Sequence, residues 1–327
     1  MIYAESLSTD PYWNLAFEEF LFEKLPSEEV FYLWQNSNTV VVGKYQNTAE
    51  EINHSYASEQ GIRVVRRLSG GGAVYHDEGN LNYSFIVKQP DDAEIFDFHR
   101  FSEPLLTVLN GYGLKAECTG RNDILLDGKK ICGNAQYLKN SRLLHHGCIL
   151  LDSDISRMTA ALNVRAAKFQ SKGDPSVRSR VTTINSCLER KIPIEALKKA
   201  LKSAVFGSAD IIPYQLTEAA RKEINRLRDE KYTSWEWNYG NDEEYEMRRE
   251  QKFPAGLVTV SLKAEKSRII KIAFRGDFFG NGEIGELEQR LEGARLDDSL
   301  IQELKKAGLN RYMNGITPEQ LSGLIIG

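Results

Sequence analysis

Apolar and polar residues alternate along the chain with two different periods, which together predict a mixture of helices and strands. Helical spacing fills residues 11–25, where Asp10 is placed to cap the helix and Pro11 suits its first turn. Further helices are expected near residues 47–61, 98–110, 155–162, 195–205 and 217–231. Strand-like apolar runs occupy residues 30–35, 39–43, 62–69, 73–77 and 81–89.

Turn signals connect several of the expected strands. The runs at 73–77 and 81–89 are joined across residues 78–80. Residues 122–152 have the pattern of hairpin strands, with Asp127 and Gly128 as a strong signal for a two-residue turn.

The pattern changes at residues 237–256, a polar and charge-dense stretch that predicts a linker. Two alternating segments and three amphipathic helices follow, at residues 256–264, 268–280, 284–293, 297–308 and 317–325. We therefore expect an α+β protein, with a large domain of mixed sheets at residues 1–243 and a small α+β domain at residues 250–327.

Composition narrows the class of protein. The 327 residues are 41% apolar and 27% charged, as in an ordinary globular protein, and the net charge of −4 argues against a general nucleic-acid binder. The four cysteines form no C-x-x-C pair, which favours a reducing compartment. No signal peptide and no membrane-length apolar run is visible, so we expect a cytoplasmic protein without membrane contact.

Three consecutive glycines stand out in the stretch RRLSGGGAVYHD, residues 66–77. The stretch lacks the G-K-[ST] ending of a P-loop and is not G-x-G-x-x-G. A bulged hairpin is the simplest structural interpretation, but a bulge needs only one glycine. Three glycines leave unshielded backbone N–H groups beside Arg66, Arg67 and Ser69, which favours a binding site for an anionic or extended ligand.

The hairpin residues NDILLDGKK contain a second set of candidate groups. Asp123 could hold a magnesium ion, and a lysine after the turn could bind a carboxylate or phosphate. Lys129 and Lys130 point to opposite faces of a strand, so at most one faces a site, and composition does not say which.

A third candidate is the basic stretch from Arg165 to Arg180, which carries five cationic residues against the single acid Asp174. The net charge of this stretch is positive, whereas that of the whole chain is negative, which favours a polyphosphate partner. The adjacent pair His145 and His146 is a poor metal chelate, because neighbouring residues of a strand point opposite ways. A Cys–His nucleophile stays open, since three cysteines lie near the expected site: Cys118, Cys132 and Cys148.

Together these segments resemble the lipoate–protein ligase family. The resemblance rests on the segments RRLSGGGAVYHDEGN, GRNDILLDGKKICGNAQ, HHG and KGDPSVRSRVT. Near the C-terminal end it rests on FPAGLVTVSLKA, GDFFG and ELEQRLEG. The resemblance implies a catalytic domain related to biotin ligases and class II aminoacyl-tRNA synthetases, followed by an accessory domain. It also implies a two-step reaction, in which lipoate and Mg-ATP give lipoyl-adenylate and a protein lysine then accepts the lipoyl group.

The resemblance also implies roles for individual residues, with Lys130 touching both lipoate and phosphate. ATP would be bound by Arg67, Gly72, Ala73, Val74, Tyr75, Asp123, Lys130 and Arg178, with Asp123 near Mg²⁺. Lipoate would be bound by Ser69, Gly70, Gly71, Gly72, His76, Lys130 and His146. Where some members of the family carry an arginine facing lipoate, this chain has Tyr137.

Alternative functions remain at this stage. An octanoyltransferase of the same fold would move an acyl chain from acyl carrier protein through a cysteine thioester, with Cys118 near the required place. A non-catalytic binder of lipoyl domains is the second alternative, and a biotin ligase the third. The acceptors that the resemblance implies are the H protein of glycine cleavage and the acyltransferase subunits of 2-oxoacid dehydrogenases.

Overall fold

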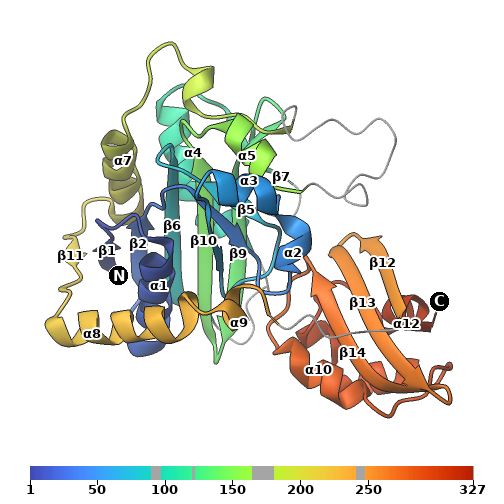
Figure 1. Cartoon of the computed structure of the whole chain (residues 1–327). Coiled ribbons are helices and arrows are strands. Elements are labelled where there is room, and N and C mark those ends of the chain that lie inside the picture. The colour runs from blue at the N-terminus through green and yellow to red at the C-terminus, as the bar shows by residue number, and fades with distance from the viewer. Residues whose placement is uncertain (90–96, 120–121, 164–179, 241–246, 327) are drawn as a thin grey trace.

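The computed structural model describes residues 1–89, 97–119, 122–163, 180–240 and 247–326. Figure 1 shows a large body built around one long mixed sheet and a smaller body, at the C-terminal end of the chain, built around a second sheet. The α+β class and the mixed sheets that the pattern predicts are confirmed.

The main sheet has eight strands in the order β11-β1-β2-β6-β10-β9-β8-β7. Strand β1 pairs in parallel with β11 and β2, and the other neighbours are antiparallel. The strands are β1 (Ile2–Glu5), β2 (Val30–Trp34), β6 (Asn80–Lys88), β7 (Ala116–Thr119), β8 (Asp123–Leu126), β9 (Lys129–Lys139), β10 (Arg142–Leu150) and β11 (Ile212–Pro213).

Helices cover both faces of this sheet. On one face, α4 (His99–Gly111) and α7 (Ile194–Phe206) bury a core that includes Leu105 and Leu197. On the other face lie α1 (Pro11–Lys24), α8 (Glu218–Leu227) and the short π-helix η3 (Arg228–Tyr232). The predicted cap of α1 is confirmed, because Asp10 Oδ1 accepts a hydrogen bond from the amide of Tyr12 at 3.2 Å.

A small three-stranded sheet packs beside α1 and places the glycine segment. Its order is β4-β3-β5, with β4 (Arg63–Arg66), β3 (Thr39–Val42) and β5 (Val74–His76). The hairpin interpretation of the glycine segment is therefore wrong, since β3 lies between the two strands that the glycines connect. The strands on either side of residues 78–80, β5 and β6, likewise belong to different sheets. The glycine segment therefore crosses over β3 within the small sheet, whereas the connection from β5 to β6 passes from the small sheet to the main sheet.

The helix expected over residues 47–61 is two short helices, α2 (Thr48–Glu51) and α3 (His54–Glu59). The cause is a second capping residue, because Asn53 adopts extended backbone angles and accepts a hydrogen bond from the amide of Tyr56. Farther along the chain, α5 (Ile155–Ala161) packs against α3 and β5, and the turn η2 (Asn185–Cys187) precedes α7.

The C-terminal body is an antiparallel sheet with three helices on one face. The sheet consists of β12 (Met247–Phe253), β13 (Gly256–Glu265) and β14 (Arg268–Gly276). Its core is closed by α10 (Ile284–Leu291), α11 (Leu300–Ala307), the turn η4 (Leu309–Arg311) and α12 (Pro318–Ile326). The predicted linker at 237–256 is wrong in part, since β12 and the end of α9 (Trp235–Asn238) fall inside it. Strand β12 is an edge strand with mostly half-exposed or exposed side chains, which explains its polar composition.

The two bodies contact each other beside the glycine segment. The rings of Tyr45 and Phe278 stack with their centroids 4.9 Å apart, and the amide of Gly276 donates to the carbonyl of Tyr45 at 2.8 Å. Lys44 Nζ forms an ion pair with Glu283 at 2.9 Å. The division into domains at residues 1–243 and 250–327 stays a prediction.

Candidate active site

Two adjoining cavities lie between the main sheet and the small sheet. The first has a volume of about 110 Å³ and the second about 210 Å³. Both are bordered by the same five residues: Ala73, Val74, Lys130, Gly133 and Cys148. A molecule spanning the two cavities would therefore pass Lys130 at their junction.

The three glycines have different neighbours. A Cβ at Gly70 would lie 2.4 Å from the carbonyl oxygen of Phe278 in the C-terminal body. Gly71 has a φ of +87°, a conformation that favours glycine, and packs against the ring of Phe279. Gly71 and Gly72 line the first cavity, and a Cβ at Gly72 would meet nothing within 4 Å. Gly70 thus makes room for the C-terminal body, and Gly72 for the cavity.

Arg67 holds the glycine segment in shape from the inside. Its Nη2 donates to the carbonyls of Gly70 and Gly72 at 2.7 and 2.8 Å, and its Nε donates to Ser69 Oγ at 3.0 Å. The side chain borders the first cavity and is buried, and burial lowers the pKa of Arg67 to about 10. The described surroundings therefore make Arg67 a clamp on the backbone, and its predicted contact with ATP stays a prediction.

A buried chain of hydrogen bonds starts at Ser69, which precedes the glycines. Ser69 Oγ lies 2.6 Å from His146 Nε2, and His146 Nδ1 lies 3.0 Å from Glu18 Oε1. Ser84 Oγ donates to Glu18 Oε1 at 2.6 Å. A carboxylate only accepts hydrogen bonds, so the His146 Nδ1–H points to Glu18. The orientation of the His146 ring at the cavity is thus set by contacts at both nitrogens.

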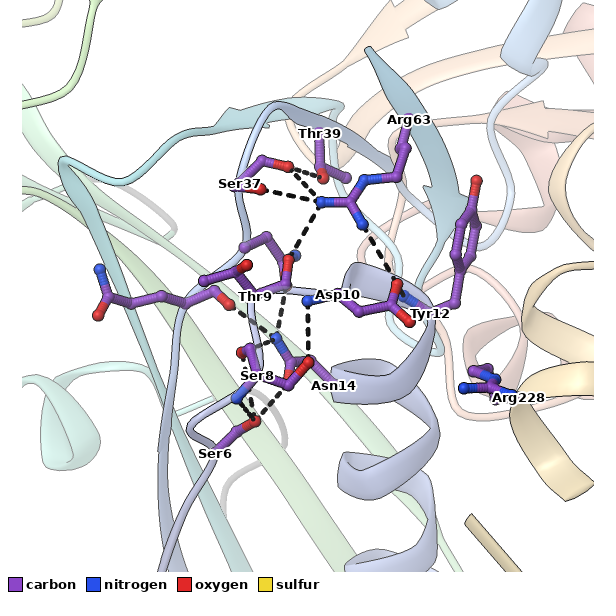
Figure 2. A network of polar contacts seen from close by, with 12 residues as sticks. Ser6, Ser8, Thr9, Asp10, Tyr12, Asn14, Ser37, Thr39, Arg63 and Arg228 are labelled. Carbon is purple, nitrogen blue, oxygen red and sulfur yellow. Dashed lines mark hydrogen bonds and ion pairs between the residues drawn. The ribbon is translucent and has the colours of Figure 1, made fainter. Parts of the chain in front are cut away.

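His76 also borders the first cavity, and its proton is placed by a longer network. Asn14 is anchored at the start of α1 beside Ser6 and Ser8, as Figure 2 shows. The Asn14 amide donates to Asn36 Oδ1 at 2.9 Å, which turns the Asn36 amide toward His76 Nδ1 at 3.2 Å. The proton then sits on Nε2, for which no partner is present among the described residues. Burial, with Arg67 nearby, lowers the pKa of His76 to about 3, so the ring is neutral.

Lys130 reaches both cavities because of a bulge in strand β9. The register of β8 and β9 shifts so that Cys132 pairs with Ile124 while Lys130 pairs with Leu125, which leaves Ile131 as an extra residue. Strict alternation would place Lys130 on the face opposite Gly133 and Ala135, and the bulge returns it to their face. A Cβ at Gly133 would lie 2.6 Å from Lys130 Nζ, so the glycine is what leaves space for the lysine.

Asp123 borders neither cavity but forms an ion pair with Lys130, in which Oδ1 and Nζ are 2.7 Å apart. The Lys129 side chain is exposed, as the alternation of the hairpin predicts for one of the two lysines. In the described part of the chain, no group of three or more histidines, cysteines and acidic residues could hold a metal ion. Asp123 alone still suits Mg²⁺, which in nucleotide sites takes one or two carboxylates together with phosphate oxygens.

The second cavity is mainly apolar, with Leu150, Met158 and Leu162 on its walls. Ala73, Val74 and Tyr75 of the predicted ATP set also border it, and the Tyr75 hydroxyl donates to Asn38 Oδ1 at 3.1 Å. The amide of Thr182 donates to the Lys130 carbonyl at 3.0 Å, which brings the end of the basic stretch to the same edge. The rest of that stretch, including Arg178, lies outside the described residues.

None of the three cysteines near the site has the setting of an activated nucleophile. Cys132 is buried, whereas Cys148 is half-buried and borders both cavities. Desolvation raises the pKa of both thiols, that of Cys148 to about 12. Cys118 is half-buried with its sulfur 3.9 Å from Ser102 Oγ, and it borders neither cavity.

Sequence reasoning missed several residues of the first cavity, among them Leu15, Trp34, Asn82 and Asn134. Asn82 is buried, and both its amide atoms lack a partner among the described residues. A signal existed in strand β6, where polar residues at 80, 82 and 84 alternate inside an otherwise apolar run. Tyr137, by contrast, does not border the cavity, since its ring packs on Phe22 with centroids 5.5 Å apart.

Sequence comparison agrees with this geometry and gives the class of the protein. Residues 10–206 match the lipoyl protein ligase A/B catalytic domain, and residues 242–325 match the bacterial lipoate protein ligase C-terminus. The chain is 41% identical over 322 residues to a lipoate–protein ligase of Bacillus subtilis, covering 97% of both proteins. The chain belongs to the lipoate–protein ligase family.

Solved structures show the same fold. A Plasmodium falciparum LipL1 structure in complex with lipoate has a TM-score of 0.78 at 21% identity, covering 99% of this chain and 98% of that chain. A lipoate–protein ligase A structure bound with ATP has a TM-score of 0.64 at 27% identity, covering 73% of this chain and 99% of that chain. Among the described helices of this chain, none combines the length and the apolar character that crossing a membrane requires.

Proposed function

We propose that this protein ligates lipoate to a lysine of lipoyl-domain proteins in an ATP-dependent reaction through lipoyl-adenylate. The observation that carries the proposal is the position of Lys130, which borders both cavities at their junction. The narrow first cavity suits the acyl chain of lipoate, and the second suits the nucleotide. Family membership and the lipoate and ATP named for the related structures support this assignment.

In the first step, a carboxylate oxygen of lipoate attacks the α-phosphorus of ATP, and the bond to pyrophosphate breaks. Two anions must approach each other, and Lys130 lies where it would contact both. Asp123, beside Lys130, is the carboxylate that would hold Mg²⁺, which when bound supplies charge neutralisation on the triphosphate. Lys130, Asp123 and the cavity backbone thereby orient the reactants without a protein nucleophile.

In the second step, the amine of the acceptor lysine attacks the lipoyl carbonyl, and AMP leaves. The backbone of Gly72, Ala73 and Val74 borders the junction and would position the acyl group during this attack. The acceptors we propose are the H protein of glycine cleavage and acyltransferase subunits of 2-oxoacid dehydrogenases, in the cytoplasm.

Transfer of octanoate through a cysteine thioester is not favoured. Desolvation raises the pKa of the Cys132 and Cys148 thiols, and Cys118 borders neither cavity. A thioester enzyme requires a thiolate at the reacting carbonyl.

The test measures pyrophosphate release with lipoate, with octanoate and with neither, followed by the mass of an added lipoyl domain. We expect release and acceptor modification that both require ATP and Mg²⁺, and that persist in Cys118→Ser and Cys132→Ser. Octanoyl transfer from acyl carrier protein without ATP, abolished in Cys118→Ser, would contradict the proposed function.

A further inference from the structure

One part of the wall of the first cavity is backed by a residue of the C-terminal body. Phe279 is 3% exposed and packs in a cluster with Phe98 and Ala135, its ring centroid 5.7 Å from that of Phe98. A Cβ on Gly71 would lie 3.3 Å from the Phe279 ring. Gly71 and Ala135 both border the first cavity, so the ring lies directly behind two of its lining residues.

The two lining residues in front of Phe279 are both small. Gly71 has no side chain, and Ala135 has only a methyl group. Substantial support for this part of the cavity therefore comes from the Phe279 ring, which belongs to a different body from the cavity it backs.

The position of this wall along the cavity follows from strand β9. Gly133 borders both cavities, whereas Ala135 borders only the first. The two residues share a face of the strand, which places Ala135 about 7 Å beyond the junction. A carboxylic acid whose carboxylate meets Lys130 at the junction would therefore extend its apolar tail toward Ala135 and Gly71.

We propose that Phe279 sets the length of acyl chain that the first cavity accepts, so that the C-terminal body takes part in substrate selection. This inference rests on the proposed function, because it assumes that the cavity holds the acid with its carboxylate at Lys130. Truncating the ring would open space behind Gly71 and Ala135, into which a longer tail could extend. Protein interiors refill such space only partly.

The experiment compares the wild-type protein with Phe279→Ala and Phe279→Leu on octanoate, decanoate and dodecanoate. Pyrophosphate release gives kcat/KM for each acid, and quenching of tryptophan fluorescence, with Trp34 in the cavity wall, gives binding without ATP. We expect Phe279→Ala to raise the ratio of decanoate to octanoate about tenfold or more in both measurements, since one methylene changes discrimination at least that much. In Phe279→Leu this ratio should lie between the values for the wild-type protein and for Phe279→Ala.

The matched control is Phe278→Ala, the same truncation one residue earlier. Phe278 is equally buried but stacks on Tyr45 within the core of the C-terminal body. Loss of the Phe278 ring should weaken the binding of all three acids by the same factor. The ratio of decanoate to octanoate should therefore stay unchanged. An unchanged ratio in both Phe279 variants, or the same change in Phe278→Ala, would overturn the proposal.

The two readouts also separate this inference from the proposed function. A wild-type protein that binds lipoate but releases no pyrophosphate with it would contradict ligation, whereas a shifted binding ratio in Phe279→Ala would still support the role of Phe279. Pyrophosphate release by the wild type with unshifted ratios in the variants would contradict only the role of Phe279.

Discussion

The two cavities differ in how their polar groups are held. In the first, the ring nitrogens of His146 and the guanidinium of Arg67 are bound by other protein groups before any ligand is present. The second has apolar walls, and Glu51 and Lys130 are its only charged lining residues among those described. The first cavity is thus organised by the protein itself, whereas the charge in the second would come mainly with the nucleotide. Among the described residues that border both cavities, Lys130 is the charged one.

The largest effect is expected where the two cavities meet. Lys130→Ala should reduce pyrophosphate release by about 10²-fold or more, because one preorganised charge contact with the reacting groups is lost. Lys129→Ala is the matched control and should be nearly silent, since that side chain is exposed. A protein inactivated by Lys129→Ala but not by Lys130→Ala would show that the assignment of the junction is wrong.

The next effect tests whether the position of Lys130, and not only its charge, matters. Gly133→Ala would place a methyl group 2.6 Å from Lys130 Nζ and displace the lysine. We expect about tenfold slower pyrophosphate release, because small displacements of reacting groups are costly. The midpoint of thermal unfolding should change little, since the end of a flexible side chain can move aside. A fully active Gly133→Ala protein would mean that Lys130 needs no fixed position.

The buried hydrogen bonds that join Ser69, His146, Glu18 and Ser84 should affect lipoate binding and stability, but not ATP binding. Glu18→Ala leaves Ser84 and His146 without their acceptor, which should lower the free energy of unfolding by about 1–3 kcal/mol. KM for lipoate should rise while KM for ATP stays near the wild-type value. Denaturant titration and steady-state kinetics measure both, and an equal rise in the two KM values would remove the contrast between the cavities.

His76 should make stability depend on pH. Its pKa of about 3 in the folded protein lies below the unfolded value of 6.5, so between these pH values the unfolded chain binds the additional proton. The free energy of unfolding should therefore fall as pH falls below 6.5, by up to about 1.4 kcal/mol per pH unit from this residue. His76→Gln should have a shallower slope in urea titrations at pH 6.5 and pH 4.5. An unchanged slope would contradict a neutral buried ring.

The smallest effect separates the glycines. Gly72→Ala adds a methyl group where nothing lies within 4 Å, so the thermal midpoint should stay within the error of measurement. KM for lipoate should rise a few-fold, because the first cavity narrows. Gly70→Ala is the contrasting variant, since its methyl group would collide with the Phe278 carbonyl oxygen. It should lower the thermal midpoint, and equal midpoints in the two variants would contradict this division of roles.

The sequence by itself determined most of the local structure. Helix α1 with its Asp10 cap, the turn at Asp127 and Gly128, and the opposite orientation of Lys129 and Lys130 follow from residues close together in the chain. The unusual run of glycines and the candidate group at Lys130 were also visible there. These features depend on backbone preferences and side-chain periods that act over a few residues.

Only the tertiary structure decided which lysine reaches the cavities and why each glycine is needed. The bulge at Ile131 turns Lys130 toward Gly133, and Gly70 is bare because residue 278, far away in the chain, lies against it. The proton on His76 is likewise placed by Asn14 and Asn36, which precede it by many positions. Such features arise from contacts between distant segments, and a local pattern of residues carries no information about which segments will meet.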